Sequence, residues 1–210
     1  MAQQWNEYEN YGTDSYDQNT QDYYSNGNQI IRKDGRNCFV ECTSKGFPLQ
    51  KVHLFFATYD LHLPQGQRQT NRISIYIPIE EFLELTANAT NGNLMWRYNE
   101  QIQQNDTGPL YERLGGTSAA KLADYHASRP DGAAVSRCVQ LVRGKKKDFL
   151  LNAYSGRGRE GKTGLIIPDF GGNPEQKVSI ALSWSELVQM LLMVKTHYQA
   201  WLTAQYLSQN

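Results

Sequence analysis

Residues 156–163, GRGREGKT, match the phosphate-binding pattern GxxxxGK[ST] at every defined position. In a P-loop a strand precedes this motif and a helix follows it, so that backbone N–H groups and the helix N-terminus converge on the phosphates. Here residues 164–174 contain three glycines, two prolines and β-branched residues, which predict a strand and a turn. A P-loop enzyme is therefore only a second alternative function.

The same residues make this part of the chain strongly basic. We expect Arg157, Arg159 and Lys162 to project from a flexible Gly-rich hairpin, because glycine lets the backbone approach a ligand closely. The preceding turn, 143–147, is also basic and contains Lys145 and Lys147. Two basic turns that flank one strand suit a polyanion that follows the strand. The alternative is a pair of solvated hairpin tips.

Single-stranded nucleic acid needs cations for its phosphates and aromatic rings for its bases, with stacking worth roughly 1–3 kcal/mol per base. We expect Tyr59 and Tyr154 to face outward from their strands, with Phe55 and Tyr76 as further aromatic candidates, while Phe56 and Leu151 face the helices. In the first half the basic candidates include Lys51. The predicted nucleic-acid-binding residues are Tyr59, Arg68, Arg72, Lys145, Lys147, Tyr154, Arg157, Arg159 and Lys162.

Other chemistry has little support in the sequence. The three cysteines, Cys38, Cys42 and Cys138, have no second ligand pair near them, so we expect buried free thiols and no metal site. Glu80 and Glu81 suit the first turn of a helix, where carboxylates favour the helix dipole. No Ser, His and acidic residue form a recognisable nucleophile setting. We therefore expect no reaction and no cofactor.

An internal repeat organises the chain. Residues 73–85 (ISIYIPIEEFLEL) align without gaps on residues 178–190 (VSIALSWSELVQM), an offset of 105. Upstream, residues 53–60 resemble residues 148–155 at an offset of 95, which places Tyr59 on Tyr154. Two matched pairs in the same order favour duplication of one unit.

Each repeat has the pattern of strands followed by a helix. In the second repeat, Ser183 and Glu186 form a capping box, and the helix should run to about Leu207. The first helix should end near Asn91-Gly92. Strands are predicted at 36–43, 51–59 and 71–77, with the weak segment 61–70 in place of a further one, and at 135–142, 147–155, 162–168 and 176–182.

The chain thus divides into four segments. Residues 1–28 form a disordered, acidic, Tyr/Asn/Gln-rich tail, 29–92 the first repeat, 93–134 a connector with short helices near 93–104 and 117–127, and 135–210 the second repeat. The tail has five acidic residues and no Lys or Arg, although the whole chain has zero net charge. It would recruit a protein partner or compete for the basic groove; the alternative is a solubilising tail. The chain lacks a long apolar run or a secretory signal, so we expect no membrane association and a cytoplasmic location.

Four strands followed by a long helix, with Trp184 just after the cap, resemble the PC4-like, Whirly and PUR group of single-stranded nucleic-acid-binding proteins. The similar segments are 135–207 and, more loosely, 36–91. The resemblance implies nucleic acid bound by the sheets and implicates Tyr59, Arg68, Arg72, Lys147, Tyr154, Arg157, Arg159 and Lys162.

We therefore expect an α+β fold of two strand-rich ββββα-like repeats with antiparallel sheets and a long C-terminal helix. The expected function is largely sequence-independent binding of single-stranded DNA, in preference to RNA. The first alternative is a protein-interaction or structural module. The sequence leaves a monomer and a homo-oligomer as alternatives.

Overall fold

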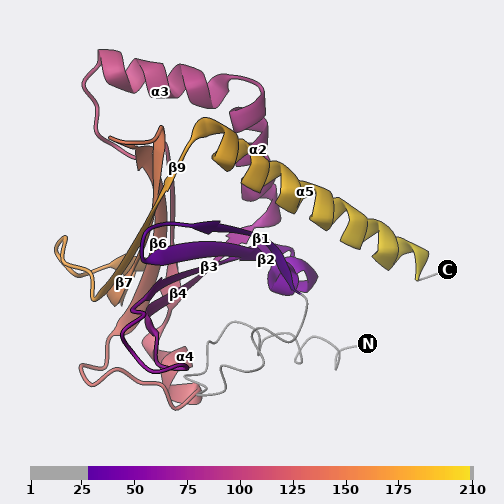
Figure 1. Ribbon diagram of the computed structural model, residues 1–210. Helices are drawn as coiled ribbons and strands as arrows, with labels where there is room; N and C mark the ends of the chain where they lie inside the picture. The colour runs from indigo at the N-terminus through magenta and orange to yellow at the C-terminus, as the bar shows by residue number, and fades with distance from the viewer. Residues whose placement is uncertain (1–27, 209–210) are drawn as a thin grey trace.

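The computed structural model describes residues 28–208 and shows an α+β fold with two antiparallel sheets (Figure 1). The first sheet has the strand order β1-β2-β3-β4, and a 3₁₀ helix, η2, joins β2 to β3. Two helices follow this sheet. The elements are β1 (Gln29–Asp34), β2 (Cys38–Thr43), η2 (Ser44–Leu49), β3 (Lys51–Tyr59), β4 (Gln69–Pro78), α2 (Ile79–Thr90) and α3 (Asn93–Gln103).

The second sheet has the order β5-β6-β7-β8, and β9 also pairs with β7. Strand β7 is long enough to serve two neighbours, since residues 149–155 pair with β9 and residues 158–160 pair with β8. The long C-terminal helix follows. The elements are β5 (Tyr111–Thr117), α4 (Ala119–Asp124), β6 (Ala134–Arg143), β7 (Phe149–Glu160), β8 (Ile166–Pro168), β9 (Gln176–Leu182) and α5 (Trp184–Leu207).

Helices α2 and α5, which close the two repeats, begin and end where the sequence predicts. The Ser183 hydroxyl accepts from the N–H of Glu186, and the Glu186 carboxylate accepts from the N–H of Ser183, which confirms the capping box. Helix α2 ends at Thr90, and α5 reaches Leu207. No helix in residues 28–208 is long and apolar enough to cross a membrane.

Two edge strands differ from the expectation. Segment 61–70 is mostly turn, and the fourth strand of the first sheet is β1, which precedes the predicted ones. In the second half, β5 lies within the segment expected to be a connector. Gly116 lies inside β5 at φ +154°, where a Cβ would collide with the carbonyl oxygen of Val135.

The Gly-rich segment expected to be a flexible hairpin is also a strand. Strand β7 continues through Gly156–Glu160, and the turn begins only at Gly161. A Cβ at Gly158 would lie 2.7 Å from Cγ2 of Ile166 and 2.8 Å from the Ser136 nitrogen. Glycine therefore permits close approach of neighbouring strands here. It does not provide flexibility.

Strand pairing corrects the alignment of the repeats. Ile77 pairs with Val52, and its counterpart Leu182 pairs with Phe149, so β3 and β7 correspond at an offset of 97 and not 95. Tyr154 therefore occupies the position of Ala57. The shift of two residues keeps Tyr59 and Tyr154 on corresponding faces, because alternate residues of a strand share a face.

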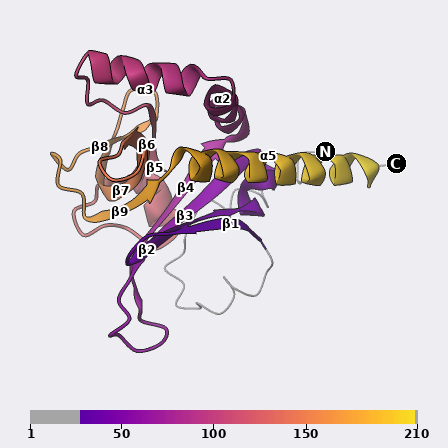
Figure 2. The same cartoon turned by 45° about the horizontal axis from the view of Figure 1, so that its top comes forward.

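One hydrophobic core joins the two halves, and helices α2 and α5 each form hydrogen bonds with the edge strand of the opposite half (Figures 1 and 2). Glu81 of α2 accepts hydrogen bonds from the Tyr111 hydroxyl and from Arg113 of β5, both at 2.7 Å. Lys33 of β1 donates to Gln189 of α5 at 2.6 Å. In both views α5 passes over the first sheet.

The alternation predicted for β3 and β7 holds. Phe56 and Leu151 face this core, at 0% and 5% exposure. The tail assigned to residues 1–28 lies, apart from Asn28, outside the described residues.

Candidate nucleic-acid interface

The face of the first sheet opposite the core carries a separate aromatic cluster. Side chains alternate between the two faces of a strand. Val40 and Phe56 point into the core, so Phe39, Phe55 and Tyr59 point to the other face. The ring of Phe39 lies 5.9 Å from that of Phe55 and 6.4 Å from that of Tyr59. These rings form one apolar strip on β2 and β3, which we call the outward aromatic cluster.

Two arginines lie over this cluster. The Arg32 guanidinium is 3.7 Å from the Phe39 ring centroid, and the Arg72 guanidinium is 5.8 Å from that of Phe55. Arg32 also pairs with the buried carboxylate of Glu41 at 3.1 Å, which fixes its position. Arg72 is exposed and forms no ion pair with another residue in 28–208, so its charge remains available to a ligand.

The second sheet repeats the cation–ring arrangement. The Lys177 ammonium on β9 lies 5.3 Å from the Tyr154 ring centroid on β7. Lys177 is the counterpart of Arg72 at the offset of 105, and both residues stand on the strand beside the aromatic residue. Tyr154 is half-buried, and burial raises the pKa of its hydroxyl.

The basic turn between β6 and β7 has a structural role. The Lys147 ammonium lies 2.8 Å from the Glu186 carboxylate in the capping box of α5. Together with the N–H of Ser183, it lowers the pKa of Glu186 to about 2. Asp148 in the same turn accepts from the N–H of Trp184. Lys147 thus fixes the turn to the helix, while Lys145 is exposed to solvent.

The other basic residues of β7 lie apart from Tyr154. Register along β7 is continuous, so Arg157 and Arg159 face the side opposite to Tyr154. Arg157 is paired with Asp169 at 3.1 Å and lies 3.8 Å from Asp131. Arg159 and Lys162 are exposed.

The P-loop motif lacks the required geometry. The segment from Gly156 to Glu160 is an extended strand, and β8 follows the turn where a helix would be needed.

The candidate residues of the first half come together only in part. Tyr59 and Arg72 both belong to the outward face, and Tyr59 donates to the carbonyl of Arg36 at 3.4 Å. Arg68 lies in the loop after β3, where it donates to the carbonyl of Leu63. The sequence reasoning missed Arg32, Phe39 and Lys177. Of these, Lys177 could be found by the repeat alignment, because it falls on Arg72.

The cysteines are free thiols. Cys42 is buried, which raises its pKa to about 12, and Cys138 is buried too. Cys38 is half-buried and donates to the carbonyl of Ser179 at 3.3 Å. The described residues contain no group of three His, Cys, Asp or Glu side chains placed to hold a metal ion.

Comparisons with family models, curated proteins and solved structures found no match to this chain.

Proposed function

We propose that this protein binds single-stranded nucleic acid, with little dependence on base sequence and without catalysis, on the outward faces of its two sheets. The observation that supports this most directly is the repeated cation–ring pair, Arg72 with Phe55 and Lys177 with Tyr154. The two cations occupy equivalent positions of the repeats, whereas the rings do not, since Tyr154 corresponds to Ala57 and Phe55 to Asn152. Each half nevertheless places a phosphate-binding cation beside an aromatic ring.

The energetics of these pairs suit exchange with a ligand. An exposed cation–ring contact contributes about 0.5–1 kcal/mol, whereas a stacked base contributes roughly 1–3 kcal/mol. A base can therefore take the place of Lys177 on the half-buried Tyr154 ring, and the released side chain can neutralise a neighbouring phosphate. Phe55 is only 3% exposed, so in the first sheet the half-buried Tyr59 is the ring that a base can reach. Arg72 and Lys177 are both exposed, which leaves them room to move.

The PC4-like, Whirly and PUR resemblance supports the same proposal through the strand–helix pattern of both halves. Binding to a strand, and not to a duplex, is favoured because the half-buried rings of Tyr59 and Tyr154 offer stacking surfaces that only unpaired bases can reach. As the sequence suggests, we favour DNA over RNA.

The test is fluorescence anisotropy of a labelled 20-nucleotide oligo(dT), titrated at 50 and 200 mM salt. We expect micromolar or tighter binding that weakens at the higher salt, because counterions are released from the phosphates. Arg72→Ala/Lys177→Ala should weaken binding. The matched control, Arg97→Ala/Lys195→Ala, removes the same charge from helices α3 and α5 and should bind like the wild type.

Three results would contradict the proposal. They are no binding at low salt, binding that ignores salt, and equal losses in the two double variants. Salt-insensitive capture of a protein would instead favour the interaction module. Oligo(U) and duplex probes of the same length test the preference for DNA and for single strands.

A further inference from the structure

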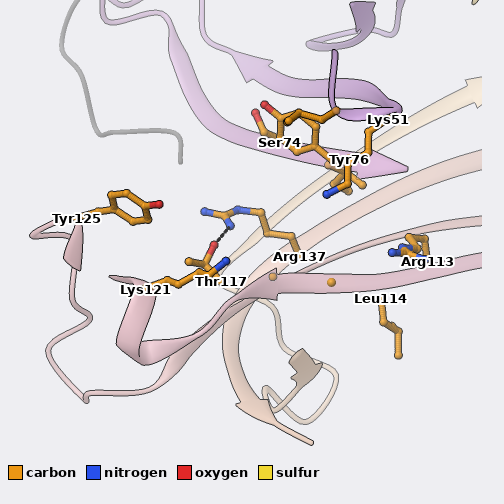
Figure 3. A pocket seen from close by; sticks show the side chains of 13 residues that line it. Lys51, Ser74, Tyr76, Arg113, Leu114, Thr117, Lys121, Tyr125 and Arg137 are labelled. Carbon is orange, nitrogen blue, oxygen red and sulfur yellow. Dashed lines mark hydrogen bonds between the residues drawn. The ribbon is translucent and has the colours of Figure 1, made fainter. Parts of the chain in front are cut away.

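A cavity of about 270 Å³ opens between strand β4 of the first sheet and strand β5 of the second (Figure 3). Its lining comes from both sheets and from α4. In Figure 3, Lys51, Ser74 and Tyr76 lie on one side, Thr117, Lys121 and Tyr125 lie on the other, and Arg137 extends between them.

The cavity is strongly basic. Lys51, Lys121 and Arg137 line it, and within residues 28–208 none of the three forms an ion pair. A fourth cation, Arg113, is paired with Glu81 at 2.7 Å. Arg137 donates to the Thr117 hydroxyl at 2.9 Å, a neutral contact that orients the guanidinium without compensating its charge.

A buried hydroxyl points to a missing hydrogen-bond partner. Ser74 lines the cavity and is 6% exposed, and its Oγ has no hydrogen-bond partner among the described residues. A buried hydroxyl without a partner is unfavourable, so such groups usually have one in a protein or in its complex. A ligand oxygen in the cavity would provide that partner.

The size and charge of the cavity together limit the ligand. Small-molecule sites have volumes of about 300–1,000 Å³, so this cavity suits a single small group and not a continuing strand. A phosphodiester within a strand has one negative charge. A phosphate monoester has a charge of about −1.5 to −2 near pH 7, which better matches three unpaired cations.

We propose that this cavity binds a phosphate monoester, the group found at the phosphorylated end of a nucleic-acid strand and on free mononucleotides. Lys51, Lys121 and Arg137 would bind its oxygens, with Ser74 donating a hydrogen bond. Tyr76 and Tyr125 line the same cavity and would contact the attached nucleoside.

The cavity also adjoins the proposed strand-binding face. Ser74 is the strand partner of Phe55 in the outward aromatic cluster, so a strand lying on that face can end in the cavity. Binding of the phosphorylated end of a strand therefore rests on the proposed function, whereas binding of a free mononucleotide does not.

Two readouts on the full chain separate these sources. The first compares the affinities of 5′-phosphorylated, 3′-phosphorylated and unphosphorylated oligo(dT) of the same length. We expect one phosphorylated form to bind about tenfold more tightly than the unphosphorylated one, as a charged hydrogen-bond network permits. The second measures the rise in Tm with thymidine monophosphate or inorganic phosphate, since a ligand that binds only the folded state stabilises it.

Lys121→Ala is the main variant, because this exposed side chain can be removed without disturbing the core. Arg137→Gln is the second. Both should abolish the advantage of the phosphorylated strand and the rise in Tm, while the control Lys146→Ala should keep both. Equal affinity for all three strands together with no Tm response would overturn the inference, and so would responses that survive Lys121→Ala and Arg137→Gln. A Lys121-dependent Tm response without oligonucleotide binding would support the cavity and reject the proposed strand-binding function.

Discussion

Removal of Lys147 should destabilise the fold and leave nucleic-acid binding unchanged. The Lys147–Glu186 pair is solvent-accessible, with side chains 42% and 33% exposed, so its contribution lies in the surface range of up to about 1 kcal/mol. The carboxylate also caps α5, which puts Lys147→Ala near the upper end, at about 0.5–1 kcal/mol. In a chain of this size that lowers Tm by roughly 1–4 °C.

The destabilisation caused by Lys147→Ala should decrease at low pH. The folded state lowers the pKa of Glu186 from 4.5 to about 2, so this carboxylate contributes stability above pH 4.5 and loses it as the pH falls towards 2. The stability difference between wild type and Lys147→Ala should therefore be constant from pH 5 to 7 and shrink below pH 4. Urea denaturation followed by circular dichroism at each pH measures it.

Lys146→Ala is the matched control, since it removes the same charge from the adjacent exposed residue. It should change neither the stability nor its pH dependence. The reasoning would be refuted by equal destabilisation in the two variants. It would also fail if Lys147→Ala weakened oligo(dT) binding by more than Lys146→Ala did.

Three further predictions concern the site, the tail and the second sheet. Arg72→Ala/Lys177→Ala should reduce the slope of log K against log salt by about 1.4, because each phosphate neutralised on a single strand contributes roughly 0.7; an unchanged slope would exclude both residues from phosphate contact. Deletion of residues 1–27 should strengthen oligo(dT) binding at 50 mM salt, because it removes five acidic side chains; unchanged affinity in anisotropy titrations would reject competition by the tail. Gly116→Ala should destabilise the protein by about 1–3 kcal/mol in urea, as strained backbone positions do. Gly115→Ala, whose Cβ would lie an ordinary 3.7 Å from the carbonyl oxygen of Arg137, should cost much less.

The sequence predicted the elements whose signals are local. The alternation of Ile73, Ile75 and Ile77 identified β4, and the capping box at Ser183 identified the start of α5. The edge strands β1 and β5 were missed because their pairing depends on neighbours distant in sequence. In β5, the close approach of β6 requires glycine at position 116. No local sequence pattern distinguishes such a glycine within a strand from a glycine in a turn.

The candidate site was predicted in part for similar reasons. Tyr59, Arg72 and Tyr154 followed from alternation and charge, and they lie on the outward faces. Arg32 could not be paired with Phe39 before β1 was known. The Lys147 ion pair joins residues 39 positions apart, so the charge run alone suggested a ligand contact where the fold uses a structural one.

The position of α5 over the first sheet has a consequence for biosynthesis. Lys33 and Gln189 are 156 residues apart, and α5 covers strands that leave the ribosome long before α5 itself is made. Until then the first sheet cannot bury its core-facing residues against their final partner. Contacts of such long sequence separation slow folding and leave apolar surface exposed. The nascent chain should therefore depend on chaperones until α5 has been synthesised, and truncation before Trp184 should yield an insoluble product.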